Sequence, residues 1–472
     1  MAQDRYDLVV IGSGSSGSFA AREAASAYGK RVAVVEKHRW GGDCMTVACK
    51  PTKTYLTSAE LYHQIRALGP ELGVLADGVR LDFRQIKARK DGFVAASSGE
   101  ARRRNLREHG IDLFDGAARF LDSRTIAVGE QRLQADNILL ALGSLPAQPP
   151  IDGLSDVGAL TNETVLDLDE VPQSLLVIGA GAVGVEFAQM LARFGARVTV
   201  VELAPRILPR MDADAAAALH EALAEEHIEI LTGSSVERLE PSERGARAVI
   251  ATPDGRREVE VARVLNAVGR RPDVDGLELE AAGLYLDGPG LPVDAYCETD
   301  VRGIWAAGDI TAVAQFTPIA NYQGRLAVHN MFSGERTPAD YRALPSAVFT
   351  DPEVASAGAT EEQAREQGVD VATAVAPLRN ASRAGFALRP HGLAKLVYEQ
   401  GSGAILGVHL VTPTASDSIQ FIAVAMRLGL TIEDLARSIH VYPSFGEIVK
   451  GAAEQALKAA EPAPARQPKE AR

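Results

Sequence analysis

Two cysteines that stand five positions apart are the residues in this sequence best suited to chemistry. Cys44 and Cys49 lie in the segment GGDCMTVACKPTK, residues 41–53. In an ideal helix, positions five apart diverge by roughly 140°, so a bridge between them requires a distorted first turn. A strained disulfide at a helix start is easily reduced, and the helix dipole together with Lys53 stabilises the thiolate that forms. The spacing therefore predicts a redox-active pair.

Two other interpretations of the pair are weaker. A zinc site needs four ligands, commonly in C-x₂₋₄-C spacing, and the sequence has no second Cys or Cys/His pair to complete one. Free cysteines also occur as small buried hydrophobes, but the polar neighbours and the two preceding glycines argue against a dry core. The third cysteine, Cys297, has no partner nearby in sequence and receives no role.

A glycine-rich turn near the start of the chain predicts a dinucleotide site. The apolar run 8–11 is typical of a buried parallel strand, and it leads into GSGSSG with Gly12, Gly14 and Gly17 before an alanine-rich helical stretch. These glycines permit a tight turn and a close approach of a pyrophosphate to backbone N–H groups. Glu36 ends the next expected strand, where its carboxylate can accept hydrogen bonds from a ribose diol.

The same order of elements returns in the middle of the chain. The turn GAGAVG contains Gly179, Gly181 and Gly184, and Glu202 takes the position that corresponds to Glu36. One such copy could be a plain strand–helix turn, but two copies with matching acids indicate two dinucleotides. An acid at position 202 repels a 2′-phosphate, which favours NADH. NADPH stays an alternative because Arg206 lies close by.

The chain's length and punctuation predict several domains. With 472 residues and 46% hydrophobic composition, it is too long for one core. We expect an α/β protein with two Rossmann-like dinucleotide-binding domains and a C-terminal α+β domain. The first domain is discontinuous, and the last residues are rich in proline and charge, which predicts a disordered tail. The expected ranges are 1–150 with 273–338, 151–272, 339–460, and 461–472 for the tail.

Charge and targeting signals exclude several partners. The formal net charge of -13 would repel phosphate backbones and anionic lipids, so we expect neither nucleic acid nor membrane partners. We find no apolar stretch of the roughly 18 residues that a membrane helix needs. Asp4, Arg5 and Asp7 lie where a signal peptide would become hydrophobic, and three cysteines are too few for a secreted disulfide scaffold. We expect a soluble cytoplasmic protein.

Taken together and in this order, these motifs closely resemble the pyridine nucleotide-disulfide oxidoreductases, which include glutathione reductase, dihydrolipoamide dehydrogenase and mercuric reductase. The resemblance covers the chain to about residue 460. It implies that the first glycine turn and Glu36 hold the ADP part of FAD, and that the second unit binds the nicotinamide nucleotide. Gly308-Asp309 would hold the ribityl-phosphate end of FAD. Gly143 and Gly269, which end the last strands of the two units, are expected at the cofactors as well.

The resemblance also assigns roles at the cysteine pair. It implies that Cys49 is the thiol against the flavin and that Cys44 exchanges with the substrate. Lys53 and Glu186 match the family's ion pair beside the flavin and the nicotinamide. The C-terminal domain should form the interface of a homodimer, in which each active site borrows a C-terminal segment from the other subunit.

That borrowed segment departs from the family's pattern. It usually reads His-Ala-His-Pro-Thr with a glutamate four residues after the proline, and here it reads HVYPSFGE, residues 440–447. His440 matches the first histidine and Glu447 keeps its place, but Tyr442 replaces the histidine that acts as acid and base. A phenol titrates near pH 10 and is a poor base, and losing such a base typically costs about 10²–10⁴-fold in rate. His440 could substitute for it or could be a structural histidine; both interpretations stay open.

The leading hypothesis is an NADH-linked, FAD-dependent disulfide reductase that acts on a small-molecule disulfide or dithiol. A dihydrolipoamide dehydrogenase-like enzyme is one alternative. A mercuric-reductase-like metal-ion reductase is another, because mercuric reductases carry tyrosine at the position of Tyr442 and resemble segment 349–354. They deliver the metal through a C-terminal cysteine pair, however, and the tail here has no cysteine. A redox-silent flavin-binding protein is the least favoured reading, since the cysteines, Lys53 and Glu186 are all retained.

Overall fold

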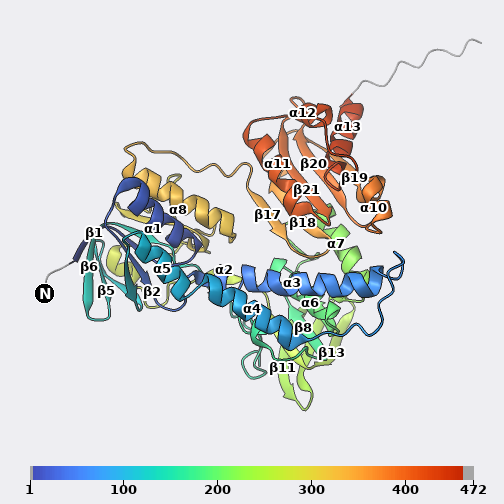
Figure 1. Cartoon of the computed structure of the whole chain (residues 1–472), viewed down its shortest axis with the longest axis horizontal. Helices are drawn as coiled ribbons and strands as arrows, with labels where there is room; N and C mark the ends of the chain where they lie inside the picture. The colour runs from blue at the N-terminus through green and yellow to red at the C-terminus, as the bar shows by residue number, and fades with distance from the viewer. Residues whose placement is uncertain (1–3, 461–472) are drawn as a thin grey trace, which may run out of the picture. The chain divides into compact units, whose positions relative to one another are not determined.

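The computed structural model describes residues 4–460, so the expected disordered tail, 461–472, lies outside the described residues. The chain forms two compact units (Figure 1). Unit 1 comprises Met1–Val201 and Ser234–Asp340, and unit 2 comprises Glu202–Gly233 and Tyr341–Arg472. Each unit has a sheet and a core of its own.

The first sheet of unit 1 is built around β1, which is buried on both faces. Leu8, Val9 and Val10 are fully buried, which explains the unbroken apolar run. The strand order is β3-β2-β1-β6-β5-β4, with β16 beside β6. Strands β2 and β6 both run parallel to β1. The bounds are β1 Asp4–Ile11, β2 Val32–Glu36, β3 Asp112–Asp115, β4 Ala118–Asp122, β5 Thr125–Val128, β6 Gln131–Leu140 and β16 Ile304–Ala306.

Two helices from distant parts of the chain pack together on this sheet. Helix α1 (Ser15–Tyr28) follows the first glycine turn, and α8 (Thr317–Phe332) follows β16. They lie side by side (Figure 1). Gly324 permits this close approach, because a Cβ at that position would lie 2.6 Å from the carbonyl oxygen of Ser16.

A second parallel sheet in unit 1 repeats the pattern on a smaller scale. Strands β9 (Arg197–Val201), β8 (Ser174–Ile178) and β14 (Arg263–Asn266) lie in that order, and helix α6 (Ala182–Arg193) follows the second glycine turn. An antiparallel sheet of β11 (Ser235–Ser242), β12 (Gly245–Thr252) and β13 (Gly255–Val261) precedes β14. One short strand follows β6 of the first sheet, and another follows β14 of the second. These two strands, β7 (Ser144–Pro146) and β15 (Arg270–Pro272), pair with each other antiparallel.

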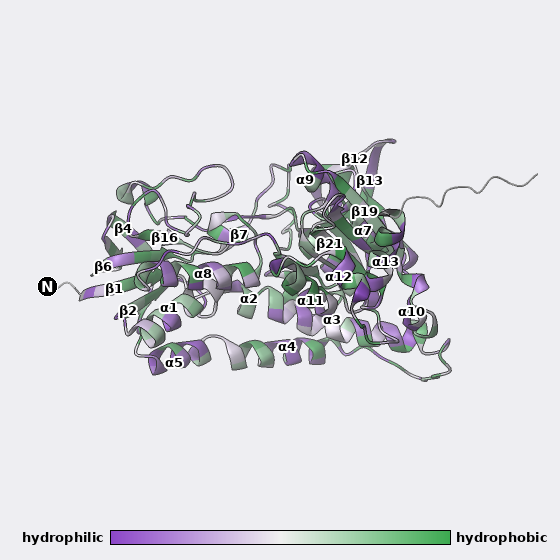
Figure 2. Cartoon of the chain, turned by 90° about the horizontal axis from the view of Figure 1, so that it is seen from above, coloured by the Kyte–Doolittle hydropathy of each residue, from purple (hydrophilic) through white to green (hydrophobic). Residues whose placement is uncertain are grey.

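Helices of unit 1 carry the cysteine segment. Helix α2 (Gly42–Thr46) is a single turn, and α3 (Cys49–His63) follows it and packs against α4 (Phe83–Ser97) and α6. Helix α5 (Glu100–Glu108) continues from α4 along the same side (Figure 2). The first turn of α3 is thereby fixed between other helices of the unit.

Unit 2 contains an antiparallel five-stranded sheet in the order β17-β18-β21-β20-β19. Its helices pack on an alanine-rich core that includes Ala452, Ala453 and Ala456, all fully buried. The α/β class with a C-terminal α+β domain is therefore confirmed. The bounds are β17 Pro345–Val348, β18 Glu353–Gly358, α9 Glu361–Glu366, β19 Val371–Pro377, α10 Ser382–Phe386, β20 Leu393–Glu399, β21 Ile405–Thr412, α11 Ala415–Arg427, α12 Ile432–Arg437 and α13 Ile448–Ala460.

A buried lysine explains why residues 202–233 group with unit 2. The ammonium of Lys395 on β20 is 3% exposed and lies 3.1 Å from Asp212, 2.7 Å from Asp214 and 2.8 Å from Glu361. Asp212 and Asp214 stand at the start of α7 (Ala213–Glu225). A buried ammonium must be paired, so these carboxylates tie α7 to the C-terminal sheet.

Candidate active site

The cysteine segment is folded against the first glycine turn. Gly41 and Gly42 have φ values of 111° and 68°, a conformation that side chains rarely adopt. A Cβ on Gly42 would lie 2.5 Å from the Cα of Gly14. The two backbones therefore touch, which places the cysteines directly beside the turn expected to receive a pyrophosphate.

The helix is interrupted between the two cysteines. Cys44 lies in the single turn α2, and Cys49 is the first residue of α3. Ala48, which precedes α3, has φ -133° and ψ -103°, outside the helical region. This break is the distortion that the five-residue spacing requires, because it lets both sulfur atoms face the same side.

Both cysteines carry free, half-buried thiols that meet at Thr317. The hydroxyl of Thr317 donates a hydrogen bond of 3.1 Å to Sγ of Cys44 and lies 3.5 Å from Sγ of Cys49. Sequence reasoning missed Thr317, which stands 273 positions after Cys44. The only sequence signal is Thr317-Pro318 at the start of a helix, and this pattern is common.

The two thiols share a hydrogen bond that separates their acidities. This bond, together with Thr317 and Lys53, lowers the pKa of Cys49 to about 6, although burial opposes the shift. The same bond, followed by burial, raises the pKa of Cys44 well above its usual range. The first proton therefore leaves Cys49, which becomes the thiolate of the pair.

Lys53 and Glu186, which lie 133 positions apart, form the expected ion pair. The ammonium of Lys53 is 3.0 Å and 2.8 Å from the two carboxylate oxygens of Glu186. Lys53 is 34% exposed and Glu186 only 7%, because α3 packs on α6. Lys53 lies one turn after Cys49, so its charge favours the Cys49 thiolate.

The two glycine turns have the same steric design. Gly12 (φ +104°) and Gly179 (φ +98°) each lie against the end of the neighbouring strand in their sheet. A Cβ on Gly12 would collide with the carbonyl oxygen of Ala141, and a Cβ on Gly179 would lie 2.7 Å from that of Ala267. In each turn the third glycine, Gly17 or Gly184, leaves no room for a Cβ against the first glycine's carbonyl. Both turns are thus tight enough to expose backbone N–H groups to a phosphate.

The middle glycines and the acids of the two copies differ. A Cβ on Gly181 would meet nothing within 4 Å, whereas Gly14 faces Gly42. Glu36 accepts hydrogen bonds from Ser13, both backbone N (2.9 Å) and Oγ (2.7 Å), and from the backbone N–H groups of residues 38 and 39. A ribose diol would take the place of one of these donors. Glu202 is 9% exposed and accepts the backbone N–H of Ala204 at 2.8 Å.

The acid expected at the ribityl end is held by a polar network. Asp309 follows β16, and its carboxylate accepts a 2.5 Å hydrogen bond from Oγ of Ser144, the residue after Gly143. The preceding Gly308 has φ 85° and donates its N–H to Gln323. Arg270, the residue after Gly269, donates to Ser144 as well and pairs with Asp43. Sequence reasoning missed Arg270 and Asp43, because their charges are unremarkable in the linear chain.

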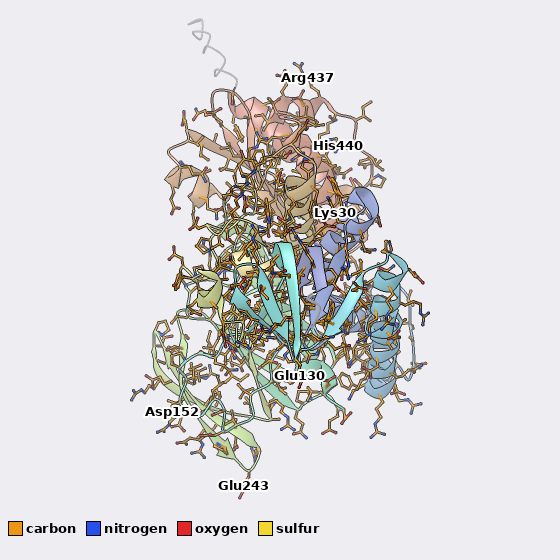
Figure 3. The ribbon with its side chains drawn as sticks, turned by 90° about the vertical axis from the view of Figure 1, so that its left-hand side faces the viewer. Lys30, Glu130, Asp152, Glu243, Arg437 and His440 are labelled. Carbon is orange, nitrogen blue, oxygen red and sulfur yellow. The ribbon has the colours of Figure 1, made fainter. Side chains whose placement is uncertain are left out.

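The C-terminal segment belongs to unit 2 and is exposed at residues 441–443. Tyr442 is 73% exposed, and its hydroxyl lies 2.9 Å from Oγ of Ser382. His440, which Figure 3 labels near Arg437, contacts the backbone oxygen of Leu435 through Nε2 at 3.2 Å. These contacts suit a structural histidine. The backbone N–H of Glu447 donates to Ser444. His440, Tyr442 and Glu447 therefore lie in unit 2, while the cysteines and the Lys53–Glu186 pair lie in unit 1.

Across residues 4–460, every helix is too short or too polar to cross a membrane. Within the same range, no cluster of three or more His, Cys, Asp or Glu residues could hold a metal ion.

Comparison with known families matches nearly the whole chain. Residues 6–324 match the family model described as pyridine nucleotide-disulphide oxidoreductase. Residues 344–453 match the dimerisation domain of the same family.

Individual relatives align with this chain over almost their full length. The chain is 36% identical to a mercuric reductase of Streptomyces lividans and 34% identical to a dihydrolipoyl dehydrogenase of Geobacillus stearothermophilus, covering 96% of this chain and of each relative. Among solved structures, LpdA from Mycobacterium tuberculosis superposes with a TM-score of 0.85 at 31% identity, covering 96% of this chain and 99% of that one. The HOCl-induced flavoprotein disulfide reductase RclA from Escherichia coli gives 0.83 at 29% identity, covering 95% and 99%.

Proposed function

Because the chain belongs to the pyridine nucleotide-disulphide oxidoreductase family, we propose that it is a disulfide reductase in which Cys44 and Cys49 receive electrons from NADH. The family is FAD-dependent, takes electrons from NAD(P)H and acts on sulfur groups. The observation that carries the proposal is the thiol pair, in which one cysteine has a pKa of about 6 and lies one turn from the Lys53–Glu186 ion pair.

Residues of unit 1 fit the flavin nucleotide. The tight turn at Gly12, Gly14 and Gly17 offers backbone N–H groups to the pyrophosphate, while Glu36 and Asp309 offer carboxylates to the hydroxyls of the ribose and the ribityl chain. FAD, when bound there, would supply hydride acceptance from the nucleotide and two-electron transfer to the disulfide. Lys53 would keep the Cys49 side of the site positive.

Two acids support NADH as the electron donor. Glu202 follows β9 directly, where a carboxylate favours a ribose diol and repels a 2′-phosphate. The guanidinium of Arg206, which could otherwise attract that phosphate, already pairs with Glu362 at 2.6 Å. The second glycine turn, from Gly179 to Gly184 and with Gly269 nearby, would hold the pyrophosphate.

The cysteines divide the chemistry between them. Cys44, as a thiolate, attacks a substrate disulfide, so that one half of the substrate leaves as a thiol and the other half stays in a mixed disulfide. The Cys49 thiolate then attacks Sγ of Cys44, which releases the second thiol and forms the Cys44–Cys49 disulfide. Two electrons from NADH regenerate the dithiol. Cys44 must lose its proton first, and Tyr442 is a poor base for this step.

The proposal includes a homodimer and a cytoplasmic location. The dimerisation-domain match and the exposed apolar side chains of Ile439, Val441 and Tyr442 support a homodimer in which the segment 440–447 completes the partner's site. Three cysteines are too few for a secreted disulfide scaffold, which supports the cytoplasm.

Reduction of a soft metal ion is the second candidate function. It is favoured by the 36% identity to a mercuric reductase and by a solved Cu(II) complex of RclA, a structure 28% identical to this chain. A dithiol binds such ions through its thiolates. NADH oxidation that depends on Hg(II) or Cu(II), and not on any disulfide, would favour this function over the first.

The test is a Cys44→Ser variant assayed with NADH against glutathione disulfide, lipoamide, an aromatic disulfide, Hg(II) and Cu(II). We expect disulfide reduction to fall by at least about 10³-fold, because the attacking sulfur is gone. Cys297→Ser is the matched control, since Cys297 is 1% exposed in the core of unit 1. Full disulfide reduction by Cys44→Ser would overturn the proposal.

A further inference from the structure

We propose that Arg270 is a positioning residue for the thiol pair, and that its ion pair with Asp43 fixes the turn that carries Cys44. This inference rests on the function proposed above. It concerns a residue that neither touches the sulfur atoms nor belongs to either glycine turn.

Every nitrogen of the Arg270 guanidinium has a partner within unit 1. Nε donates to Oγ of Ser144 at 2.7 Å, and one terminal nitrogen donates to Oδ1 of Asn162 at 3.0 Å. The other terminal nitrogen contacts the carboxylate of Asp43 and the backbone oxygen of Ser144. The side chain of Arg270 is 17% exposed and that of Asp43 34%. A planar fork with this many partners can take only one orientation.

These contacts hold both ends of the helix that carries Cys44. Asp43, at the start of α2, precedes Cys44 and pairs with Arg270 directly. Asn162, a second partner of Arg270, donates to the backbone oxygen of Val47, which caps the end of α2, at 3.3 Å. No residue of α2 is buried. A single turn without buried side chains has little side-chain packing to fix it, so these polar ties set its position together with the contact of Gly42 on Gly14.

The same guanidinium is connected through Ser144 to the acid expected at the flavin. Ser144, which accepts from Nε of Arg270, donates in turn to Asp309. Arg270 is also the first residue of β15, immediately after Gly269, which we assign to the nucleotide site. One side chain thereby joins the exchange cysteine's turn to the two segments expected to hold the cofactors.

The ion pair also balances charge next to Cys44. Asp43 faces Arg39 at 3.9 Å in addition to Arg270, and Arg39 pairs with Glu163 at 2.8 Å. Cys44 itself faces the charges of Lys50 and Arg102. Removing Asp43 leaves an extra positive charge that favours the Cys44 thiolate, whereas removing Arg270 leaves a negative charge that disfavours it. A residue with a purely structural role would not give shifts of opposite sign.

The chain supplies a matched control pair at the next position. Arg271 and Asp275 form a two-point ion pair of 3.0 Å and 2.6 Å, and both are exposed. The experiment compares Arg270→Lys, Arg270→Met and Asp43→Asn with Arg271→Lys, Arg271→Met and Asp275→Asn in the FAD-loaded dimer. It measures kcat and KM for NADH with the disulfides named above as acceptors, and the rate at a fixed pH at which iodoacetamide alkylates Cys44 of the reduced protein, located by peptide mass spectrometry.

We expect Arg270→Lys to lower kcat by about tenfold or more while kcat/KM for NADH stays within about twofold, because a misplaced exchange cysteine slows only its own half-reaction. Alkylation of Cys44 at a fixed pH should be faster in Asp43→Asn and slower in Arg270→Met. The control variants should behave like the unaltered chain.

Three outcomes overturn the inference: Arg270 variants indistinguishable from Arg271 variants, a rise in KM for NADH alone, or alkylation shifts of the same sign. If Arg270→Met does not fold, the isosteric Asp43→Asn variant decides. Failure here leaves the Cys44→Ser result unaffected, so the two proposals can fail separately.

Discussion

The thiol pair of unit 1 and the segment 440–447 of unit 2 are held in very different ways. Each cysteine contacts Thr317 and its partner thiol, and Lys53 and Glu186 are fixed by the packing of α3 on α6. By contrast, Tyr442 is 73% exposed and has one hydrogen bond to a serine side chain.

This difference separates two parts of the reaction. The groups that would receive electrons are assembled within one subunit, where burial and charge can set their acidity in advance. The groups that would manage the substrate's protons lie on a surface that, under our proposal, only a second copy of the chain covers. Electron uptake should therefore tolerate changes in the segment, and turnover should not.

The largest effect is expected from restoring a base in the segment. Tyr442→His introduces a group that titrates near neutrality, so kcat for disulfide reduction should rise by roughly 10- to 100-fold at pH 7.5. Steady-state assays with the same disulfide panel check this, and Tyr442→Phe is the control. The rate of flavin reduction by NADH should stay the same in both variants. A histidine variant no faster than the phenylalanine variant would remove the segment from the proton transfer.

A smaller effect is expected inside unit 1, from Lys53→Met. This change removes the ammonium that faces the buried carboxylate of Glu186, and we expect a loss of about 1–2 kcal/mol in the free energy of unfolding, less than for a fully buried pair because Lys53 is a third exposed. In the unaltered chain, alkylation of Cys49 should increase as the pH rises through about 6. In Lys53→Met that rise should move to higher pH, because a positive charge that lowers the pKa is gone.

Urea unfolding and alkylation of the reduced protein measure both consequences. The double variant Lys53→Met/Glu186→Gln should recover part of the lost stability, since it also removes the buried negative charge that Lys53 balanced. Equal stability of the single and double variants would show that the ion pair contributes little.

The smallest effect is expected at Thr317. Thr317→Val keeps the shape of the side chain but removes the hydroxyl. In the unaltered chain, the hydrogen bond from this hydroxyl lowers the pKa of Cys49. One hydrogen bond contributes about 1 kcal/mol, so the alkylation midpoint of Cys49 should rise by less than about one pH unit. Thr317→Ser should retain the original midpoint. If the valine and serine variants titrate alike, the hydroxyl does not stabilise the thiolate.

Local patterns made much of the fold and site predictable. The glycine turns follow from strand, turn and helix signals within some twenty residues, and the cysteine spacing required the break that precedes Cys49. Thr317 and Arg270 could not be found this way, because their importance comes from contacts with residues more than 200 positions away. The grouping of α7 with the C-terminal sheet was equally hidden, since it depends on the burial of Lys395.

The touching backbones of Gly14 and Gly42 tie the first glycine turn to the loop that carries the cysteines. Any side chain at position 42 would displace the turn that receives the pyrophosphate along with the loop that leads to Cys44. The shape of the first glycine turn and the course of the redox loop are therefore sterically coupled, so neither can accept a bulkier residue at this contact without moving the other.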